Sequence, residues 1–198
     1  MRDLNCTGIK PLQDGQLYHD PGFIPGEMAD MLLNRLIEEV PWQQDNIRIF
    51  GKTYQQPRLT ALYAENERSY TYSGITMNPL PFPSILQPVK EAVEKRADHK
   101  FTTCLLNLYR DGNDSNGWHA DNEKELGSNP VIASLSLGAT RAFHLKHLED
   151  KSLRYRLFLE HGSLLIMGGA MQHHWLHQIP KTRKPVGRRI NLTFRSIQ

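Results

Sequence analysis

His119 and Asp121 lie two residues apart in the stretch Gly117–Asp121, and their side chains could bind one metal ion together. Residues i and i+2 of a strand project from the same face, so a strand here would place the imidazole beside the carboxylate. A third ligand from a distant strand would complete a facial site of two histidines and one carboxylate. That geometry leaves open positions on iron, as an oxygenase requires. For so short a motif, a surface or capping pair is the alternative interpretation.

The third ligand must come from the later part of the chain, where the candidates are His161, His173, His174 and His177. If Met171–Pro180 forms one strand, His173 and His177 share a face and His174 points the other way. Spacing alone does not choose among these residues. A lone histidine in such a segment is more often a packed residue than a ligand.

A second chemical pattern lies near the C-terminus, where polar and apolar residues alternate from Arg189 to Arg195. One strand face would carry Arg189, Asn191, Thr193 and Arg195. Two arginines that point into a barrel are costly unless an anion meets them, and the guanidinium fork suits a carboxylate. A dicarboxylate that also chelates the metal would satisfy both arginines. The alternative is an outward polar face of an antiparallel strand.

The chain after Lys100 has to supply the strands that position these side chains. Short apolar runs recur there at intervals of about 8–12 residues, separated by Gly, Asn, Asp and Pro, which favours an antiparallel sandwich or barrel. The predicted strands are Phe101–Tyr109, Val131–Leu137, Ala142–Leu145, Tyr155–Leu159, Ser163–Met167, Trp175–Ile179 and Ile190–Phe194.

The first half of the chain is expected to be partly helical. Apolar residues spaced by four predict a helix over Glu27–Val40, which Pro41 ends. A second helix is expected over Ser84–Asp98, where Pro88 is tolerated in the first turn. Residues 1–25 are expected to be an irregular lead-in with a short extended piece at Leu17–Tyr18. The β-prone stretches of this half are Ile47–Lys52, Leu59–Tyr63 and Tyr70–Tyr72.

Composition excludes several classes of protein. A length of 198 residues fits one domain, and two cysteines, Cys6 and Cys104, cannot make a disulfide scaffold, which indicates a reducing compartment. The sequence shows no secretory signal and no apolar run near the roughly 18 residues of a membrane span, so we expect a cytoplasmic protein. The net charge of +3 conceals −5 over residues 1–140 and +8 over 141–198, which permits an acidic partner such as nucleic acid.

Taken together, these motifs resemble the AlkB family of iron(II)- and 2-oxoglutarate-dependent dioxygenases, especially its nucleic-acid repair branch. The resemblance runs from about Ile49 to Ile197. The matching stretches are Ile49–Lys52, Pro57–Arg58, Tyr70–Gly74, Asn107–Tyr109, His119–Glu123, Ile132–Ala139, His161–Leu165, Trp175–Pro180 and Arg189–Arg195. The resemblance implies an α+β, mainly β fold, with a double-stranded β-helix (jelly-roll) core and N-terminal helices packed on one side. The single domain, 1–198, would divide into an extension with helices and a nucleotide-recognition lid (1–100) and the jelly-roll core (101–198).

The resemblance also assigns roles to particular residues, all of which are expectations at this point. It implies iron(II) ligands at His119, Asp121 and His177, and it implies a 2-oxoglutarate site formed by Asn107, Tyr109, Arg189, Asn191, Thr193 and Arg195. It implies substrate contacts from Phe50, Gly51, Lys52, Arg58, Tyr70, Tyr72, Asn122 and Glu123, with Tyr72 stacked on the damaged base.

The implied reaction is oxidative demethylation of N-alkylated bases such as 1-methyladenine and 3-methylcytosine. It would consume O2, convert 2-oxoglutarate to succinate and CO2, and release the methyl group as formaldehyde. The expected substrate is alkylated DNA, single- or double-stranded, with RNA as a further candidate, and the expected state is a monomer. The alternative is a 2-oxoglutarate oxygenase that acts on modified RNA or a protein side chain. Relatives often carry an acidic residue where Asn122 stands, which leaves the preferred lesion open.

Overall fold

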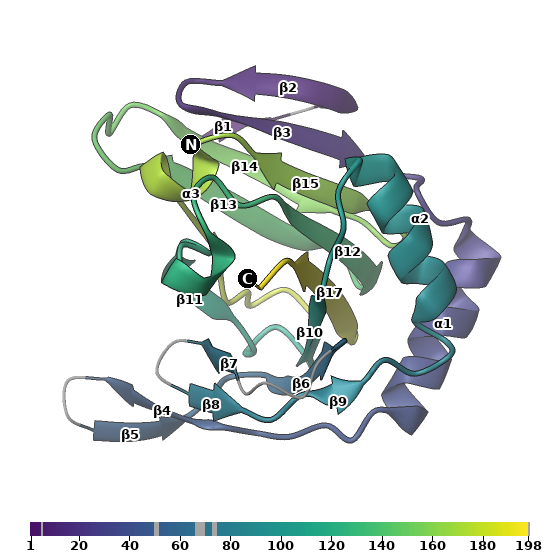
Figure 1. Ribbon diagram of the computed structural model, residues 1–198. Coiled ribbons are helices and arrows are strands. Elements are labelled where there is room, and N and C mark those ends of the chain that lie inside the picture. The colour runs from purple at the N-terminus through teal and green to yellow at the C-terminus, as the bar shows by residue number, and fades with distance from the viewer. Residues whose placement is uncertain (5, 50–51, 66–69, 73–74, 198) are drawn as a thin grey trace.

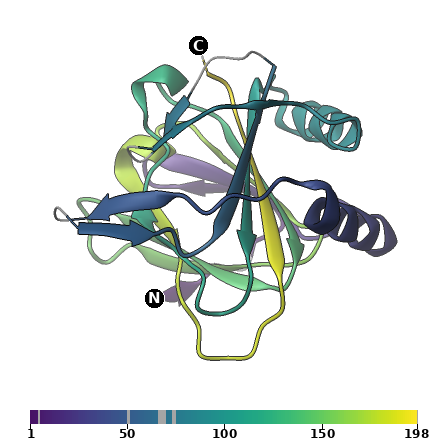
Figure 2. The same cartoon turned by 90° about the horizontal axis from the view of Figure 1, so that it is seen from below.

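The structure is a computed structural model that describes residues 1–4, 6–49, 52–65, 70–72 and 75–197. Its core is a pair of facing β-sheets, with two long helices on one side and a β-hairpin extending from the opposite side (Figures 1 and 2). The helices are α1 (Gly26–Glu39) and α2 (Gln87–Ala97), and the hairpin pairs β4 (Asn46–Ile49) with β5 (Lys52–Gln55). This arrangement confirms the mainly β jelly-roll fold with helices on one side.

The larger sheet, called the major sheet here, places the polar face of the last strand between two neighbours. Its order is β2 (Gly8–Leu12), β3 (Gly15–Asp20), β15 (Leu164–Gly168), β12 (Ile132–Gly138), β17 (Arg189–Arg195), β10 (Thr103–Tyr109), β6 (Leu59–Ala64) and β9 (Leu80–Pro81). Every residue of β10 and β17 is buried. Both faces are covered because α1 and α2 pack on one side and the second sheet lies on the other.

The smaller sheet, called the minor sheet, carries His119 and His177, the two histidines that are expected to bind iron. Its order is β1 (Arg2–Asp3), β14 (Arg154–Leu159), β13 (Arg141–His147), β16 (Trp175–Ile179) and β11 (Asn116–His119). Burial alternates strictly along β13, as in a strand with one face to the core and one toward solvent. A second apolar core between the sheets contains Leu17, Ile132, Phe143, Leu145 and Trp175.

The remaining elements are short. They are the hairpin β7 (Tyr70–Tyr72) and β8 (Ile75–Met77), the 3-10 helix η1 (Lys124–Leu126) and the single turn α3 (Met171–His174). Among the described residues, no helix is long and apolar enough to cross a membrane.

The seven strands predicted after Lys100 are all present, with ends that differ by at most two residues. Both helices are confirmed too, and Pro88 lies in the first turn of α2, which begins at Gln87 instead of Ser84. The extended piece predicted at Leu17–Tyr18 lies in β3, but the prediction that the rest of residues 1–25 is irregular is wrong, because residues 8–20 form the β2–β3 hairpin on the edge of the major sheet. Pro11 and Gly15 misled the prediction, although proline is tolerated on an edge strand.

Candidate metal centre and co-substrate pocket

A pocket between the two sheets contains most of the side chains that the sequence singled out. The major sheet contributes Asn107, Tyr109, Ser134, Arg189, Asn191, Thr193 and Arg195, and the minor-sheet side contributes Asn116, His119, Asp121, Phe143, His177 and Gln178. The alternation predicted for Arg189–Arg195 therefore faces the interior. The alternative of an outward polar face is excluded.

Two strands of the minor sheet bring the three expected metal ligands together. His119 ends β11 and pairs in register with His177 on β16, and Asp121 follows two residues after the strand ends. One ligand atom from each residue lies within 4.8 Å of the others. The sequence predicted one strand through His119 and Asp121, whereas the carboxylate in fact approaches from a loop.

The other histidine candidates lie elsewhere. His173 and His174 belong to α3, so the prediction that they continue the strand of His177 is wrong. His161 accepts a hydrogen bond from the amide of Gly138 at 2.7 Å, outside the pocket. The geometry thus groups His177 with His119 and Asp121, which spacing alone could not do.

Hydrogen bonding makes Nε2 the acceptor nitrogen of His119, a residue that lines the pocket. Nδ1 of His119 donates to the carbonyl of Gly117 at 2.8 Å, which places the proton on Nδ1. Nε2 lies 3.3 Å from the side-chain amide of Asn116, which can donate to it. Burial lowers the pKa of His119, so its imidazole is neutral at neutral pH. A neutral imidazole whose Nε2 accepts is the form that binds a metal ion, which would take the place of the amide.

His177 is held in the same neutral form. Its ring stacks on Phe143 with centroids 5.3 Å apart, and its side chain is almost completely buried. Burial, assisted by the neighbouring His119, lowers the pKa of His177 to about 3. Its Nε2 lies 3.6 Å from Oδ2 of Asp121, a separation that one bound cation could bridge.

Asp121 is fixed at both its side chain and its main chain. Oδ1 accepts a hydrogen bond from Arg195 at 2.7 Å, and both side chains are buried. Burial would raise the pKa of Asp121, but Arg195 and the two histidines outweigh it and lower the pKa to about 2. The amide of Asp121 donates to Oε1 of Gln172 at 2.9 Å. Sequence reasoning missed Gln172, since no spacing links it to a residue 51 positions away.

Arg189 has the properties of an anion-binding residue. Its side chain is fully buried, one nitrogen donates to Ser136 at 2.9 Å, and the guanidinium lies 5.2 Å from the ring centre of Tyr109. Nε and the other terminal nitrogen have no hydrogen-bond partner in the part of the chain that the structure describes. Burial, with Arg141 nearby, lowers the pKa of Arg189 to about 10. A buried cation with unused donors favours a bound carboxylate.

The two arginines differ in the contacts that they make within the protein. Arg195 donates to the carboxylate of Asp121, whereas Arg189, at the other end of β17, donates to the neutral hydroxyl of Ser136. Between them, Asn191 donates to Ser134 at 2.7 Å and accepts from Thr193 at 2.9 Å. The middle of the strand thus forms a fixed polar wall.

The expected substrate residues are described only in part. Phe50 and Gly51 lie outside the described residues, as do the side chains of Tyr70 and Tyr72, whose backbone forms β7. Lys52 is exposed at the start of β5, and Asn122 is exposed beside the pocket ligands. Arg58 is buried and donates to Asn107 at 2.8 Å, so it contacts the expected co-substrate wall instead of solvent. Burial, followed by the charge of Asp121, raises the pKa of Glu123.

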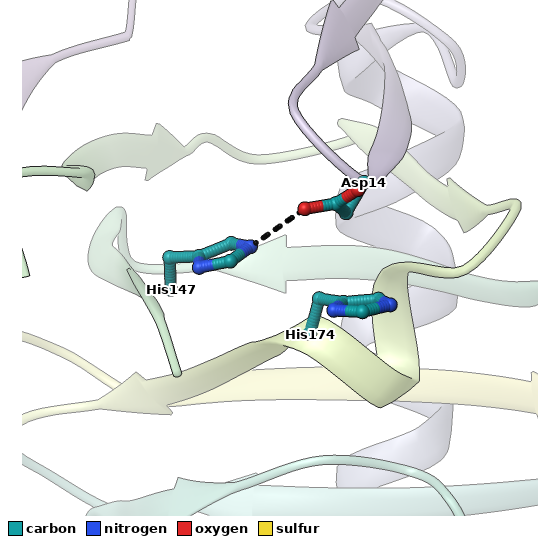
Figure 3. A group of neighbouring side chains, drawn as sticks. All are labelled: Asp14, His147 and His174. Carbon is teal, nitrogen blue, oxygen red and sulfur yellow. Dashed lines mark hydrogen bonds and ion pairs between the residues drawn. The ribbon is translucent and has the colours of Figure 1, made fainter. Parts of the chain in front are cut away.

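A second group of two histidines and one aspartate lies at the end of the β2–β3 hairpin. It consists of Asp14, His147 and His174, whose candidate ligand atoms also lie within 4.8 Å of one another (Figure 3). Nε2 of His147 donates a hydrogen bond to Asp14 at 3.2 Å. Its Nδ1 accepts hydrogen bonds from the backbone amides of Glu149 and Asp150, at 3.3 and 3.1 Å. Because Nδ1 is an acceptor, the proton sits on Nε2, so that nitrogen has no lone pair for a metal.

Comparisons with known proteins agree with this geometry. The family model of the 2OG-Fe(II) oxygenase superfamily matches residues 16–195. The chain is 45% identical over 186 residues to the alpha-ketoglutarate-dependent dioxygenase alkB homolog 3 of Rattus norvegicus, covering 89% of this chain and 62% of the relative. It is 36% identical over 179 residues to the DNA oxidative demethylase ALKBH2 of Mus musculus, covering 85% of this chain and 75% of the relative.

The fold also matches a solved structure. The structure of OsALKBH1 superposes with a TM-score of 0.64 at 19% identity, covering 95% of this chain and 99% of the other. At that identity the likeness concerns the fold alone. The family model spans nearly the whole chain and the relatives match most of it, so the chain belongs to the 2OG-Fe(II) oxygenase superfamily and, within it, to the AlkB family.

Proposed function

We propose that this protein is an iron(II)- and 2-oxoglutarate-dependent demethylase of N-alkylated bases, of the 1-methyladenine and 3-methylcytosine type, in DNA and, as a second substrate class, in RNA. One observation carries the proposal. A single pocket holds two neutral histidines, an ionised aspartate and a buried arginine with unused donors. These are the groups that a divalent iron and a chelating dicarboxylate need.

The donor set fits both groups. His119, Asp121 and His177 would hold the iron, and Arg189 with Tyr109 would hold the far carboxylate of 2-oxoglutarate. When bound, the iron and 2-oxoglutarate would supply the oxidising chemistry with O2 as the oxidant, one oxygen atom going to succinate as CO2 is lost and the other to the substrate. Arg195 keeps Asp121 ionised, and Asn107, Asn191 and Thr193 would complete the polar wall beside the co-substrate.

The substrate class draws its support from relatives. The mouse relative is named a DNA oxidative demethylase, and the chain covers 75% of it. The chain spans less than two thirds of the rat alkB homolog 3 that it also matches, so the activity of that whole protein is here a proposal. Within the chain, Glu123 lies next to the ligand loop with a raised pKa, where it could contact a base edge.

Single-stranded oligonucleotides that carry one 1-methyladenine or 3-methylcytosine test the proposal. With iron(II), 2-oxoglutarate and O2, we expect equal amounts of formaldehyde, succinate and repaired base. The matched control is Asp121→Asn, which keeps the shape of the ligand and removes its charge. The proposal is contradicted if the iron-loaded wild type oxidises 2-oxoglutarate but leaves the methyl groups on DNA and RNA, while a modified peptide is consumed.

A further inference from the structure

The outer face of the minor sheet carries cationic and aromatic side chains. Alternation along the strands directs His144 and Lys146 of β13 outward, on the opposite side from the core residues Phe143 and Leu145. Helices α1 and α2 pack on the far side of the molecule, against the major sheet (Figure 1). We define the outer minor face by Trp118, His144, Lys146, Arg154, Arg156 and Phe158.

Aromatic rings and cations alternate on this face. Trp118 on β11 is 36% exposed, and Nζ of Lys146 lies over its ring at 4.3 Å. Phe158 on β14 is 43% exposed, and the guanidinium of Arg156 lies over its ring at 5.2 Å. Large exposed rings beside cations are typical of surfaces that bind single-stranded nucleic acid, because bases stack on the rings and phosphates meet the cations.

The charges on this face are not internally balanced. Lys146 pairs directly across the strands with Arg154, and like charges in that position destabilise a sheet. Neither side chain has a carboxylate partner among the residues that the structure describes. Arg156, by contrast, forms a two-pronged ion pair with Asp3 at 2.7 and 3.1 Å. The unpaired cations therefore favour an anionic partner.

The position of Trp118 connects this face with the pocket. Trp118 precedes the expected ligand His119 in β11, the last strand of the minor sheet, so the two side chains lie on opposite sides of one edge strand. A strand of nucleic acid with one base in the pocket could cross this edge and continue over the outer minor face.

We propose that the outer minor face binds the single-stranded DNA that flanks the base in the pocket, with Trp118 stacking a flanking base and Lys146 and Arg154 contacting phosphates. The choice of substrate rests on the proposed function. Single-stranded DNA fits better than a duplex because the exposed ring needs an unstacked base as its partner.

Fluorescence anisotropy with an unmodified single-stranded oligonucleotide of about fifteen nucleotides measures this binding without catalysis. We expect Trp118→Leu to weaken binding about 5- to 100-fold. Lys146→Glu should weaken the binding of the oligonucleotide and reduce the slope of its logarithmic affinity against logarithmic salt concentration by about one. The control is Lys95→Glu on the exposed side of α2, which makes the same charge change on the opposite side. The proposal is overturned if the Lys146 and Lys95 variants bind the oligonucleotide with equal affinity. It is also overturned if the substitutions on the outer minor face weaken the binding of duplex DNA but leave the binding of the single strand unchanged.

A second measurement separates this proposal from the proposed function. Demethylation of a methylated trinucleotide should have the same KM in the wild type and in Trp118→Leu, while KM for the long oligonucleotide rises in the variant. A protein that binds the oligonucleotide through this face but removes no methyl group would sink the proposed function and support the surface. Unchanged KM for both lengths would sink the surface and leave the demethylase in place.

Discussion

The described residues contain two groups of two histidines and one aspartate, and only one group is arranged to bind a metal. His119, Asp121 and His177 lie inside the pocket, and Asp14, His147 and His174 lie at the end of a hairpin. Both groups have their candidate ligand atoms within the same distance. What separates them is the hydrogen bonding of the second ring nitrogen.

The ring of His119 donates from Nδ1 to a carbonyl, whereas the ring of His147 accepts two amides at Nδ1. In a neutral imidazole, a nitrogen that donates carries the proton, and the other nitrogen then has the lone pair. A nitrogen that accepts holds the lone pair itself, and the proton is then on the other nitrogen. The backbone around a histidine therefore decides whether it is a ligand, as outer contacts do in metal sites generally. His147 instead fastens the β2–β3 hairpin, with help from Trp175, whose Nε1 donates to the carbonyl of Gln13 at 2.9 Å.

The largest expected effect on stability comes from removing the cation that pairs with Asp121. Arg195→Met would leave Asp121 buried without its cation, and removing one partner of a buried pair costs about 3–5 kcal/mol of unfolding free energy. We expect this loss in chemical denaturation of the metal-free protein at neutral pH. Loss of less than about 1 kcal/mol, the range of exposed pairs, would contradict the buried ion pair.

The same variant has a pH signature. The pKa of Asp121 is lowered from 3.8 to about 2 in the folded protein, so its stabilisation is present above pH 3.8 and is lost as pH falls toward 2. The stability gap between wild type and Arg195→Met should narrow across that interval. A gap that stays constant would mean that the loss is one of packing alone.

The next largest effect concerns the main chain of the ligand loop. Gln172→Met keeps the length of the side chain but removes the acceptor for the amide of Asp121, and we expect metal affinity to fall about 10- to 100-fold. Gln13→Met, on the exposed turn beside the second group, is the matched control and should bind metal like the wild type. Equal affinity in both variants would show that Gln172 does not position Asp121.

The smallest effect is expected at the second group. Asp14→Asn removes the charge that faces His147 and should cost about 0.5–1.5 kcal/mol of stability, with no change in metal content. Asparagine is a suitable replacement because Asp14 has φ 55°, a conformation that asparagine tolerates. If metal content falls in this variant, the second group is a metal site after all.

Local patterns made much of the fold predictable from the sequence. The seven later strands follow from short apolar runs and turn residues, and the alternation of Arg189–Arg195 correctly places its polar face inward. The helix α2 was predictable down to the place of Pro88 in its first turn. Such features depend on residues close in sequence.

Features that depend on distant residues were not predictable in this way. The four residues of α3 directly precede Trp175. His173 therefore does not lie on a strand with His177, and the alternation of a strand cannot place the two side chains on one face. The Arg195–Asp121 pair joins residues 74 positions apart, and its engagement separates the two arginines that the sequence treated as equivalent. The choice of His177 as a ligand came from the family resemblance, and the three-dimensional grouping agrees with it.

Titration of the metal-free protein with iron(II) under anaerobic conditions tests the central comparison most directly. We expect one tight site per chain in the wild type and in His174→Ala, and no tight site in His177→Ala. Circular dichroism should confirm that both variants are folded. Equal iron affinity in the two histidine variants would show that His177 is not a ligand. A second tight site that disappears in His174→Ala would show that the second group binds metal.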